Sequence, residues 1–266
     1  MTINSFNPEF GYELISVLPY AYWAHKQGLL DKTISATDTR CLYYFSPNHQ
    51  ENEKQRSWYY DGEVTAVDMI INAGIPNARI HRAQLDTSRF LPPPFKTAYK
   101  NDWARFDKPT FVIFNRYNNE YPATYNEPIN FFSLGFLPQL VGRLGDYHIL
   151  YVNIDGQEKL YDNAPPLPLG DYEWCKQNDI THVRDLQEKH PGLSFNQILL
   201  YYFANCQNFL TMNGGGSILA SYFGGRNIIY TKYCKELTTG DFGYYHLFGG
   251  SQIEVVNSYD AILNNL

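Results

Sequence analysis

Short apolar runs alternate with amphipathic segments through the second half of this chain. "TFVIFN" (110–115) and "YHILYVN" (147–153) have the length and the β-branched and aromatic content of buried strands. Between them, "INFFSLGFLPQLVGRLG" has helical spacing and ends at Gly145. A strand, a helix and a second strand in this order form a βαβ unit, so the pattern predicts a parallel sheet.

The alternation continues to the end of the chain. The segment "PGLSFNQILLYYFANC" predicts a helix with Ser194 as its N-cap. The second half is therefore expected to form a doubly wound, nucleotide-binding layer. Its remaining predicted elements are strand 208–213, helix 217–224, strand 227–231, strand 252–256 and helix 258–266.

The first half predicts a smaller α/β partner. Residues 12–27 carry apolar side chains at helical spacing, with a kink expected at Pro19 and an end at Gly28. With 266 residues the chain is long enough for two α/β units, and we place an N-terminal domain at 1–105 and a C-terminal domain at 106–266. The other predicted features of the first half are strand 41–46, helix 64–74, strand 78–83 and a proline-rich connection at 90–96.

A triple glycine separates a predicted strand from a predicted helix in "FLTMNGGGSILASYFGGRNIIY" (209–230). Glycines let the backbone approach a ligand closely, and the first N–H groups of a helix attract anions, so the turn predicts a phosphate site. A tight connection that binds nothing would have the same sequence. A dinucleotide fingerprint read from Gly214 places Leu219 at its third glycine, which disfavours a dehydrogenase.

Polar residues directly follow the predicted strands. Ligands of open α/β sheets bind outside the carboxyl ends of the strands, so these positions are candidate binding residues. Arg116 offers two parallel donors to a phosphate, although pairing with Glu120 explains this arginine equally well. Arg116 and the glycine turn together suggest a diphosphate. The candidate donor-binding residues are Arg116, Asn153, Asn213, Gly214, Gly215, Gly216, Ser217 and Lys232.

The segment "FNPEFGYEL" supplies a candidate for proton transfer. Glu9 lies in a loop that contains proline and glycine, where its carboxylate is placed to take a proton from an attacking hydroxyl; an ordinary solvated or capping role is the alternative. Glu13 is explained by the favourable interaction of a carboxylate with the first turn of a helix.

Composition narrows the class of protein. The net charge is −6, which disfavours non-specific binding to nucleic acid, and aromatic residues make up 17% of the chain, which suits sugar rings as well as cores. The four cysteines show no metal or disulfide spacing, and neither a leader nor a membrane span is visible. We therefore expect a cytoplasmic protein without a membrane span.

Several chemistries lack their motifs. The histidines and carboxylates form no H-E-x-x-H or D-x-D pattern, so we expect neither a metal site nor another cofactor. The phosphate-binding loop G-x-x-x-x-G-K-[ST] and the hydrolase motif G-x-S-x-G are also absent from the sequence.

The segments "PEFGYELISVLPYAYW", "FVIFNRYNNEYP" and "FLTMNGGGSILASYFGGRNIIY" together resemble glycosyltransferases of the GT-B architecture. Within that group the chain is similar to fucosyltransferase-like and heptosyltransferase-like enzymes of surface-polysaccharide synthesis. The resemblance implies an α/β fold of two Rossmann-like domains that face each other across a cleft. The C-terminal domain would hold a nucleotide diphospho-sugar, and the N-terminal domain a glycan or glycolipid acceptor.

The resemblance also implies roles for particular residues. Arg116 and the turn from Gly214 to Ser217 would bind the donor phosphates, and Glu9 would act as the base of an inverting, metal-independent hexosyl or deoxyhexosyl transfer. The fucosyltransferase pattern H-x-R-x-G is absent, because Phe114 and Asn118 occupy its outer positions, so the sugar stays open. A sugar-nucleotide epimerase and a non-catalytic nucleotide- or glycan-binding module are the alternatives.

Overall fold

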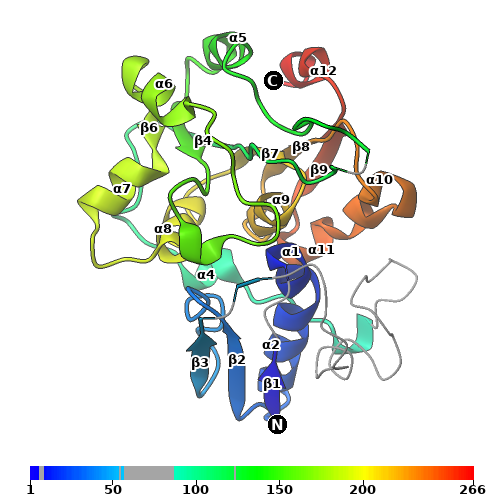
Figure 1. Cartoon of the computed structure of the whole chain (residues 1–266). Helices are drawn as coiled ribbons and strands as arrows, with labels where there is room; N and C mark the ends of the chain where they lie inside the picture. Colours follow the sequence, from blue (N-terminus) through cyan, green and yellow to red (C-terminus); the bar gives the residue numbers. More distant parts are fainter. Residues whose placement is uncertain (6–8, 54, 57–86, 123) are drawn as a thin grey trace.

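The computed structural model describes residues 1–5, 9–53, 55–56, 87–122 and 124–266, and it is an α/β protein with two parallel sheets (Figure 1). The larger sheet has the strand order β6-β5-β4-β7-β8-β9. Its strands are β4 (Thr110–Phe114), β5 (His148–Val152), β6 (Thr181–His182), β7 (Asn208–Met212), β8 (Arg226–Tyr230) and β9 (Gln252–Val256).

This strand order is that of a doubly wound fold. From β4 the chain adds β5 and β6 toward one edge of the sheet, and it then adds β7, β8 and β9 toward the other edge, so the order of strand addition reverses between β4 and β7. Every neighbouring pair is parallel, which confirms the predicted parallel sheet. Five of the six strands match predicted ones to within two residues, whereas β6 was not predicted. The reversal brings the loops after β4 and β7 next to each other.

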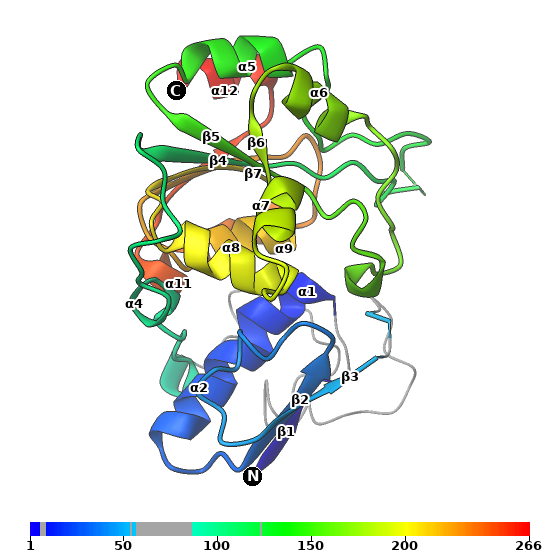
Figure 2. The same ribbon diagram turned by 90° about the vertical axis from the view of Figure 1, so that its left-hand side faces the viewer.

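Helices cover both faces of this sheet (Figure 2). Alternate strand residues serve the two faces: Phe111 and Ile113 pack toward α5, whereas Val112 and Phe114 belong to the core that contains α8 and α9. Ser194 caps α8, as predicted, with its hydroxyl accepting the N–H of Gln197. The helices of this half are α5 (Leu137–Arg143), α6 (Asp171–Gln177), α7 (Val183–Lys189), α8 (Phe195–Phe203), α9 (Gly215–Ser221), α10 (Glu236–Thr239), α11 (His246–Gly249) and α12 (Tyr259–Asn264), and 3₁₀ turns lie at Glu158–Leu160 and Asp241–Tyr244.

The smaller sheet lies in the first half and has the order β1-β2-β3. The predicted helix 12–27 is present, but it begins as α1, passes through a π-helical turn, and continues as α2 with Pro19 in its first turn. Pro19 thus lies directly after the π-helical turn, and the kink expected there stays a prediction. The elements are β1 (Thr2–Asn4), α1 (Phe10–Tyr12), the π turn (Glu13–Val17), α2 (Leu18–Lys26), β2 (Lys32–Ala36), β3 (His49–Asn52), a 3₁₀ turn (Thr87–Arg89) and α4 (Phe95–Ala98).

The predicted strand 41–46 is wrong. These residues form successive turns, in which the N–H of Leu42 bonds to Thr39 O at 2.8 Å and that of Ser46 to Tyr43 O at 2.8 Å. The apolar character of the run comes from packing, since Tyr43 and Phe45 are buried against each other. The predicted helix 64–74 and strand 78–83 lie outside the described residues.

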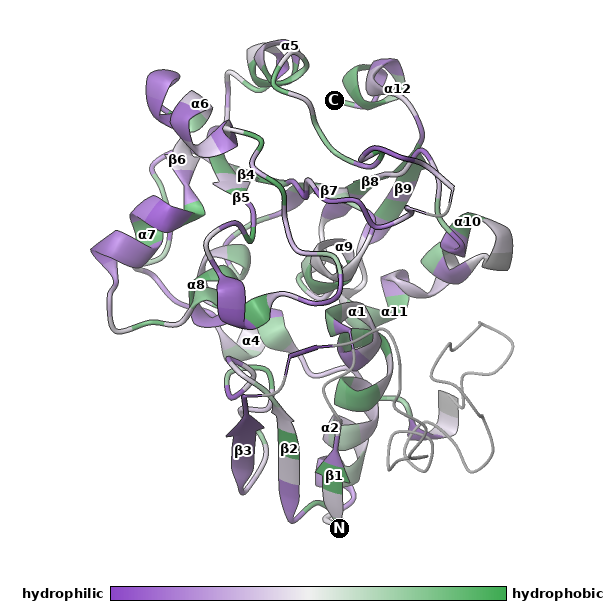
Figure 3. Ribbon diagram, in the orientation of Figure 1, coloured by the Kyte–Doolittle hydropathy of each residue, from purple (hydrophilic) through white to green (hydrophobic). Residues whose placement is uncertain are grey.

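Contacts between α1 and α9 join the two halves (Figure 1). The hydroxyl of Tyr222, next to α9, donates to Leu14 O at 2.6 Å, and the backbone N–H of Asn196 donates to Oδ2 of Asp38 at 2.8 Å. Hydrophobic residues gather along the inner elements, whereas β3 and α7 are largely hydrophilic (Figure 3). The sheets lie on either side of the predicted domain boundary at residue 105, whose position stays a prediction. Across the described ranges, every helix is too short or too polar to cross a membrane.

Candidate functional site

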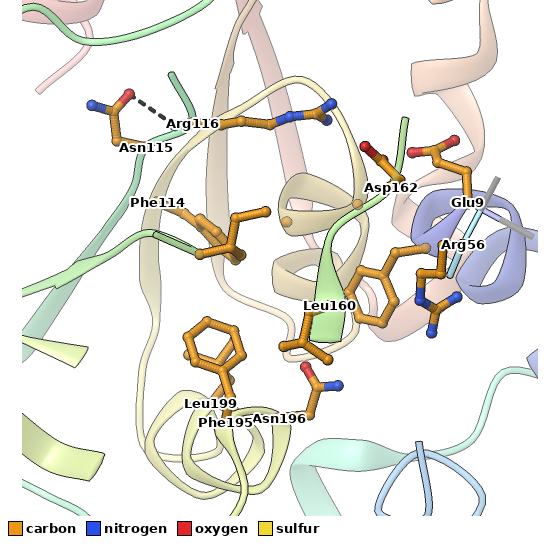
Figure 4. Close-up of a pocket in the computed structure, with 14 residues that line it drawn as sticks. Glu9, Arg56, Phe114, Asn115, Arg116, Leu160, Asp162, Phe195, Asn196 and Leu199 are labelled. Carbon is orange, nitrogen blue, oxygen red and sulfur yellow. Dashed lines mark hydrogen bonds between the residues drawn. The ribbon is translucent and has the colours of Figure 1, made fainter. Parts of the chain in front are cut away.

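A cavity lies between the two halves, at the carboxyl ends of β4, β5 and β7 (Figure 4). It holds about 720 Å³ of empty space, counting the part that is open to solvent. Its lining residues are Glu9, Phe10 and Arg56 from the first half and Phe114, Asn115, Arg116, Ile154, Leu160, Asp162, Phe195, Asn196, Leu199, Gly215 and Gly216 from the second.

Arg116 reaches this cavity from the loop after β4. Asn115 fixes the start of the loop, because its Oδ1 accepts the N–H groups of both Arg116 (3.0 Å) and Phe132 (2.8 Å). The guanidinium is only 14% exposed, and its Nη2 lies 3.4 Å from Oε2 of Glu120. Both sequence interpretations of Arg116 are therefore compatible with one geometry, in which a cavity-lining arginine also pairs with Glu120.

The glycine turn lies beside Arg116. Gly214 has φ of +124°, and a Cβ built there would lie 2.8 Å from Nη1 of Arg116. Helix α9 begins at Gly215, two residues earlier than predicted. The structure thus brings Arg116, Gly214, Gly215 and Gly216 together at the point where the strand order reverses, the usual ligand position in such sheets.

Protein contacts give a reason for two of these glycines. A Cβ on Gly215 would lie 2.7 Å from the Phe10 ring, and one on Gly216 would lie 2.8 Å from the Phe114 ring. These distances are too short for real carbon contacts, so the absence of a side chain lets α1 and β4 approach α9. Gly215 and Gly216 therefore permit close packing, and their part in phosphate binding stays a prediction.

Glu9 lines the same cavity from the first half of the chain, directly before α1. Burial raises the pKa of its carboxyl to about 8, with Glu120, Asp162 and Glu236 adding to the rise and Arg116 opposing it. Figure 4 shows the Arg116 side chain extending toward Asp162 and Glu9. A carboxyl with a pKa close to neutral is suited to exchange protons with a substrate.

Glu13 lies in a helical turn, as expected, and also forms a buried ion pair. Its side chain is fully buried and pairs with Arg56 at 2.6 Å. Tyr43 donates to the same carboxylate at 2.9 Å, and Ser35 also donates to it. This network fixes Arg56 at the cavity wall, with its guanidinium carbon 5.1 Å from the centre of the Phe10 ring.

Five predicted residues lie apart from the cavity lining: Gly214, described above, and four others. Asn153 donates to Asp171 at 3.0 Å and lines a smaller neighbouring hollow. Asn213 is buried, and its Oδ1 has no hydrogen-bond partner among the residues described. The Ser217 hydroxyl is occupied by Gly214 O at 2.8 Å. Lys232 is exposed, and its N–H bonds to Oδ1 of Asn130.

The sequence did not predict that several carboxylates surround Arg116 and Glu9. Glu120, Asp162 and Glu236 all act on Glu9 electrostatically, and they come from three separate segments of the chain. Only Glu120 carried a signal, because it stands four residues after Arg116. Among residues 1–5, 9–53, 55–56, 87–122 and 124–266, no cluster of three or more His, Cys, Asp or Glu side chains is arranged to hold a metal ion.

Comparison with known proteins supports the fold. No protein-family model matches the chain, and no curated protein matches it in sequence. Among solved structures, the chain is similar to the ADP-heptose lps heptosyltransferase II of E. coli, with a TM-score of 0.56 and 8% sequence identity over 99% of this chain and 96% of that one. The chain therefore has the α/β fold with parallel sheets that this heptosyltransferase shows, and the GT-B architecture expected from the sequence is confirmed.

Proposed function

We propose that this protein is a glycosyltransferase that moves a sugar from a nucleotide diphospho-sugar to a hydroxyl group of a glycan or glycolipid acceptor. One observation carries the proposal: Arg116 and the glycine turn meet at the switch point of the sheet and share a cavity with Glu9. A candidate anion-binding group and a candidate proton acceptor thus border one space between the two halves. The structural neighbour, a heptosyltransferase by name, supports the same reaction class.

In the proposed reaction the donor diphosphate lies against Arg116 and the backbone of Gly214 to Gly216. The Arg116 guanidinium stabilises the negative charge that develops on the leaving diphosphate. The acceptor hydroxyl gives its proton to Glu9, and its oxygen forms a bond to the anomeric carbon while the bond from that carbon to the phosphate oxygen breaks. Attack from the side opposite the leaving group inverts the anomeric centre.

Both halves of the chain line the cavity, so both would contact a bound ligand. Phe10 and Arg56 come from the first half and Leu160 and Phe195 from the second, so ligand binding buries surface on both. Enclosure excludes water, which would otherwise hydrolyse the donor. We propose that the charge of the diphosphate is met by the arginine and the turn, without a metal ion, and that the reaction belongs to cytoplasmic synthesis of a surface polysaccharide.

A thermal-shift panel of nucleoside diphosphates and nucleotide sugars tests this proposal, since a ligand that binds only the native state raises the melting temperature. We expect one nucleotide class to stabilise the protein and its sugar conjugate to transfer to an added glycan. Conversion of the donor without an acceptor would instead identify an epimerase. Binding with no turnover in any acceptor screen would identify a binding module.

A further inference from the structure

The pairing of Arg116 with Glu120 is weaker than an arginine–carboxylate contact usually is. Charge-assisted hydrogen bonds of this kind span about 2.7 to 2.9 Å, whereas Nη2 of Arg116 lies 3.4 Å from Oε2 of Glu120. Nη2 is buried and makes no hydrogen bond to any residue that the structure describes. The guanidinium therefore lies near the Glu120 carboxylate, but its Nη2 forms no hydrogen bond with it.

Both residues belong to the loop that follows β4, which has no regular secondary structure. Glu120 lies near Nη2 of the guanidinium, and Gly214 lies near Nη1. A phosphate that approaches Arg116 from the cavity would compete with the Glu120 carboxylate for the same donors. The surroundings intensify this competition, because Asp162 and Glu9 also act on Arg116 electrostatically.

We propose that Glu120 is an internal counter-anion that holds the phosphate-binding face of Arg116 in the empty protein and sets donor affinity by being displaced. Glu120 is thus a positioning residue that acts through Arg116 and lowers affinity for the diphosphate. This inference rests on the proposed function, and it adds a residue that determines how tightly the donor binds.

Several ionisable groups lie around Glu120 and affect the pKa of its carboxyl. Arg116 lies on its own loop, while Asp162 and Glu236 come from other segments, and Tyr121 and Glu9 complete the cluster. Burial raises the pKa of Glu120, with Arg116 opposing and the two carboxylates adding to the rise. Protonation of Glu120 would remove the competing charge, so the wild-type protein should approach the behaviour of a glutamine variant as the pH falls.

The test measures the affinity of inorganic pyrophosphate and of nucleoside diphosphates by calorimetry for the wild type, Glu120→Gln and Arg116→Ala. We expect Glu120→Gln to bind about tenfold more tightly, and we expect this gain to shrink as the pH is lowered. The gain should vanish when Arg116→Ala is also present, because Glu120 acts through that guanidinium. Glu127→Gln makes the same charge change at an exposed position of the same loop and should alter affinity little.

Weaker or unchanged binding by Glu120→Gln, with an Arg116-dependent wild-type site, would overturn this inference and leave the proposed function standing. An equal gain in Glu127→Gln would also overturn it, because the effect would then be one of net charge alone. Absence of any pyrophosphate or nucleotide binding in all five proteins, including the double variant, would overturn the proposed function together with it. Melting temperatures of the variants identify any loss of binding that is due to misfolding.

Discussion

Nη1 of Arg116 lies directly over Gly214, so closely that a Cβ atom on this glycine would be only 2.8 Å away. The two residues are far apart in the sequence, and they meet because β4 and β7 are neighbours in the sheet. The loop after one strand thus supplies the cation, and the loop after the other supplies the bare backbone. The proposed diphosphate site is the space that these two loops border.

Substitution of Gly215 should destabilise the protein through packing. In Gly215→Ala the new methyl group would lie 2.7 Å from the Phe10 ring and 3.3 Å from the N atom of Gly11, so α1 has to move away from α9. Overpacking of this kind costs roughly 1 to 3 kcal/mol of unfolding free energy, measurable by chemical denaturation. Gly142→Ala is the matched control, because a Cβ there meets no atom within 4 Å and helix propensity favours alanine. A stable Gly215→Ala protein that loses only ligand affinity would contradict the packing explanation.

The pH dependence of sugar transfer should reflect Glu9. Burial raises the pKa of this carboxyl to about 8, so the carboxylate that accepts a proton forms as the pH rises through that value. We expect kcat/KM to increase with pH and to level off above about 8. Glu9→Gln should lower the rate by roughly 10²- to 10⁴-fold above pH 8, where Glu9 is ionised, and should remove this increase, so the difference from the wild type shrinks as the pH falls. A variant with the wild-type profile would exclude Glu9 as the base.

Folding stability should also depend on Glu9, with a definite sign. Its pKa is raised from 4.5 to about 8 by burial, so the folded state retains the proton over a range in which the unfolded state releases it. The stabilisation is complete below pH 4.5 and is lost as the pH rises through about 8. Relative to the wild type, Glu9→Gln should therefore melt at about the same temperature at pH 4 and at least about 2 °C higher at pH 9. A pH-independent difference in melting temperature would contradict this linkage.

Removal of metal ions should leave donor binding intact. In the proposed site, Arg116 and backbone N–H groups bind the diphosphate. Within the described ranges, no three His, Cys, Asp or Glu side chains lie close enough together to hold a metal ion. We expect nucleotide affinity and the rate of sugar transfer to be unchanged in excess EDTA. A complete loss that Mn²⁺ or Mg²⁺ restores would show that the diphosphate is bound through a metal ion.

The larger sheet could be predicted because its strands are buried on both faces. β4 is buried along its whole length, and β7 and β8 are buried after their first residue. Most of these buried positions are apolar, although Thr211 of β7 and Asn227 of β8 are polar and bond to each other.

The smaller sheet could not be found in this way. Thr33 and Ser35 of β2 are fully buried, yet their side chains are polar and are satisfied by hydrogen bonds to Ser46 and Glu13. Such a strand carries no hydrophobic pattern.

The candidate site, like the fold, could be predicted only in part. Arg116 and the glycine turn could be proposed because residues after parallel strands converge at one edge of the sheet. Arg56 and Asp162 could not, since neither follows a strand of the predicted set and their place depends on how the halves meet. Helix α9 begins two residues earlier than the pattern indicated, so Ser217 lies in its first turn and its hydroxyl donates to Gly214 O. Its role in donor binding stays a prediction.

The affinity of Arg116→Ala for nucleoside diphosphates tests the central claim most directly. Loss of a charge-assisted hydrogen bond should weaken binding by roughly 1.5 to 3 kcal/mol, measured by calorimetry on protein whose melting temperature is unchanged. Arg105→Ala, which removes an arginine whose side chain is 64% exposed, should bind like the wild type. Wild-type affinity in Arg116→Ala would contradict the account, because the diphosphate would then bind somewhere other than the switch point of the sheet.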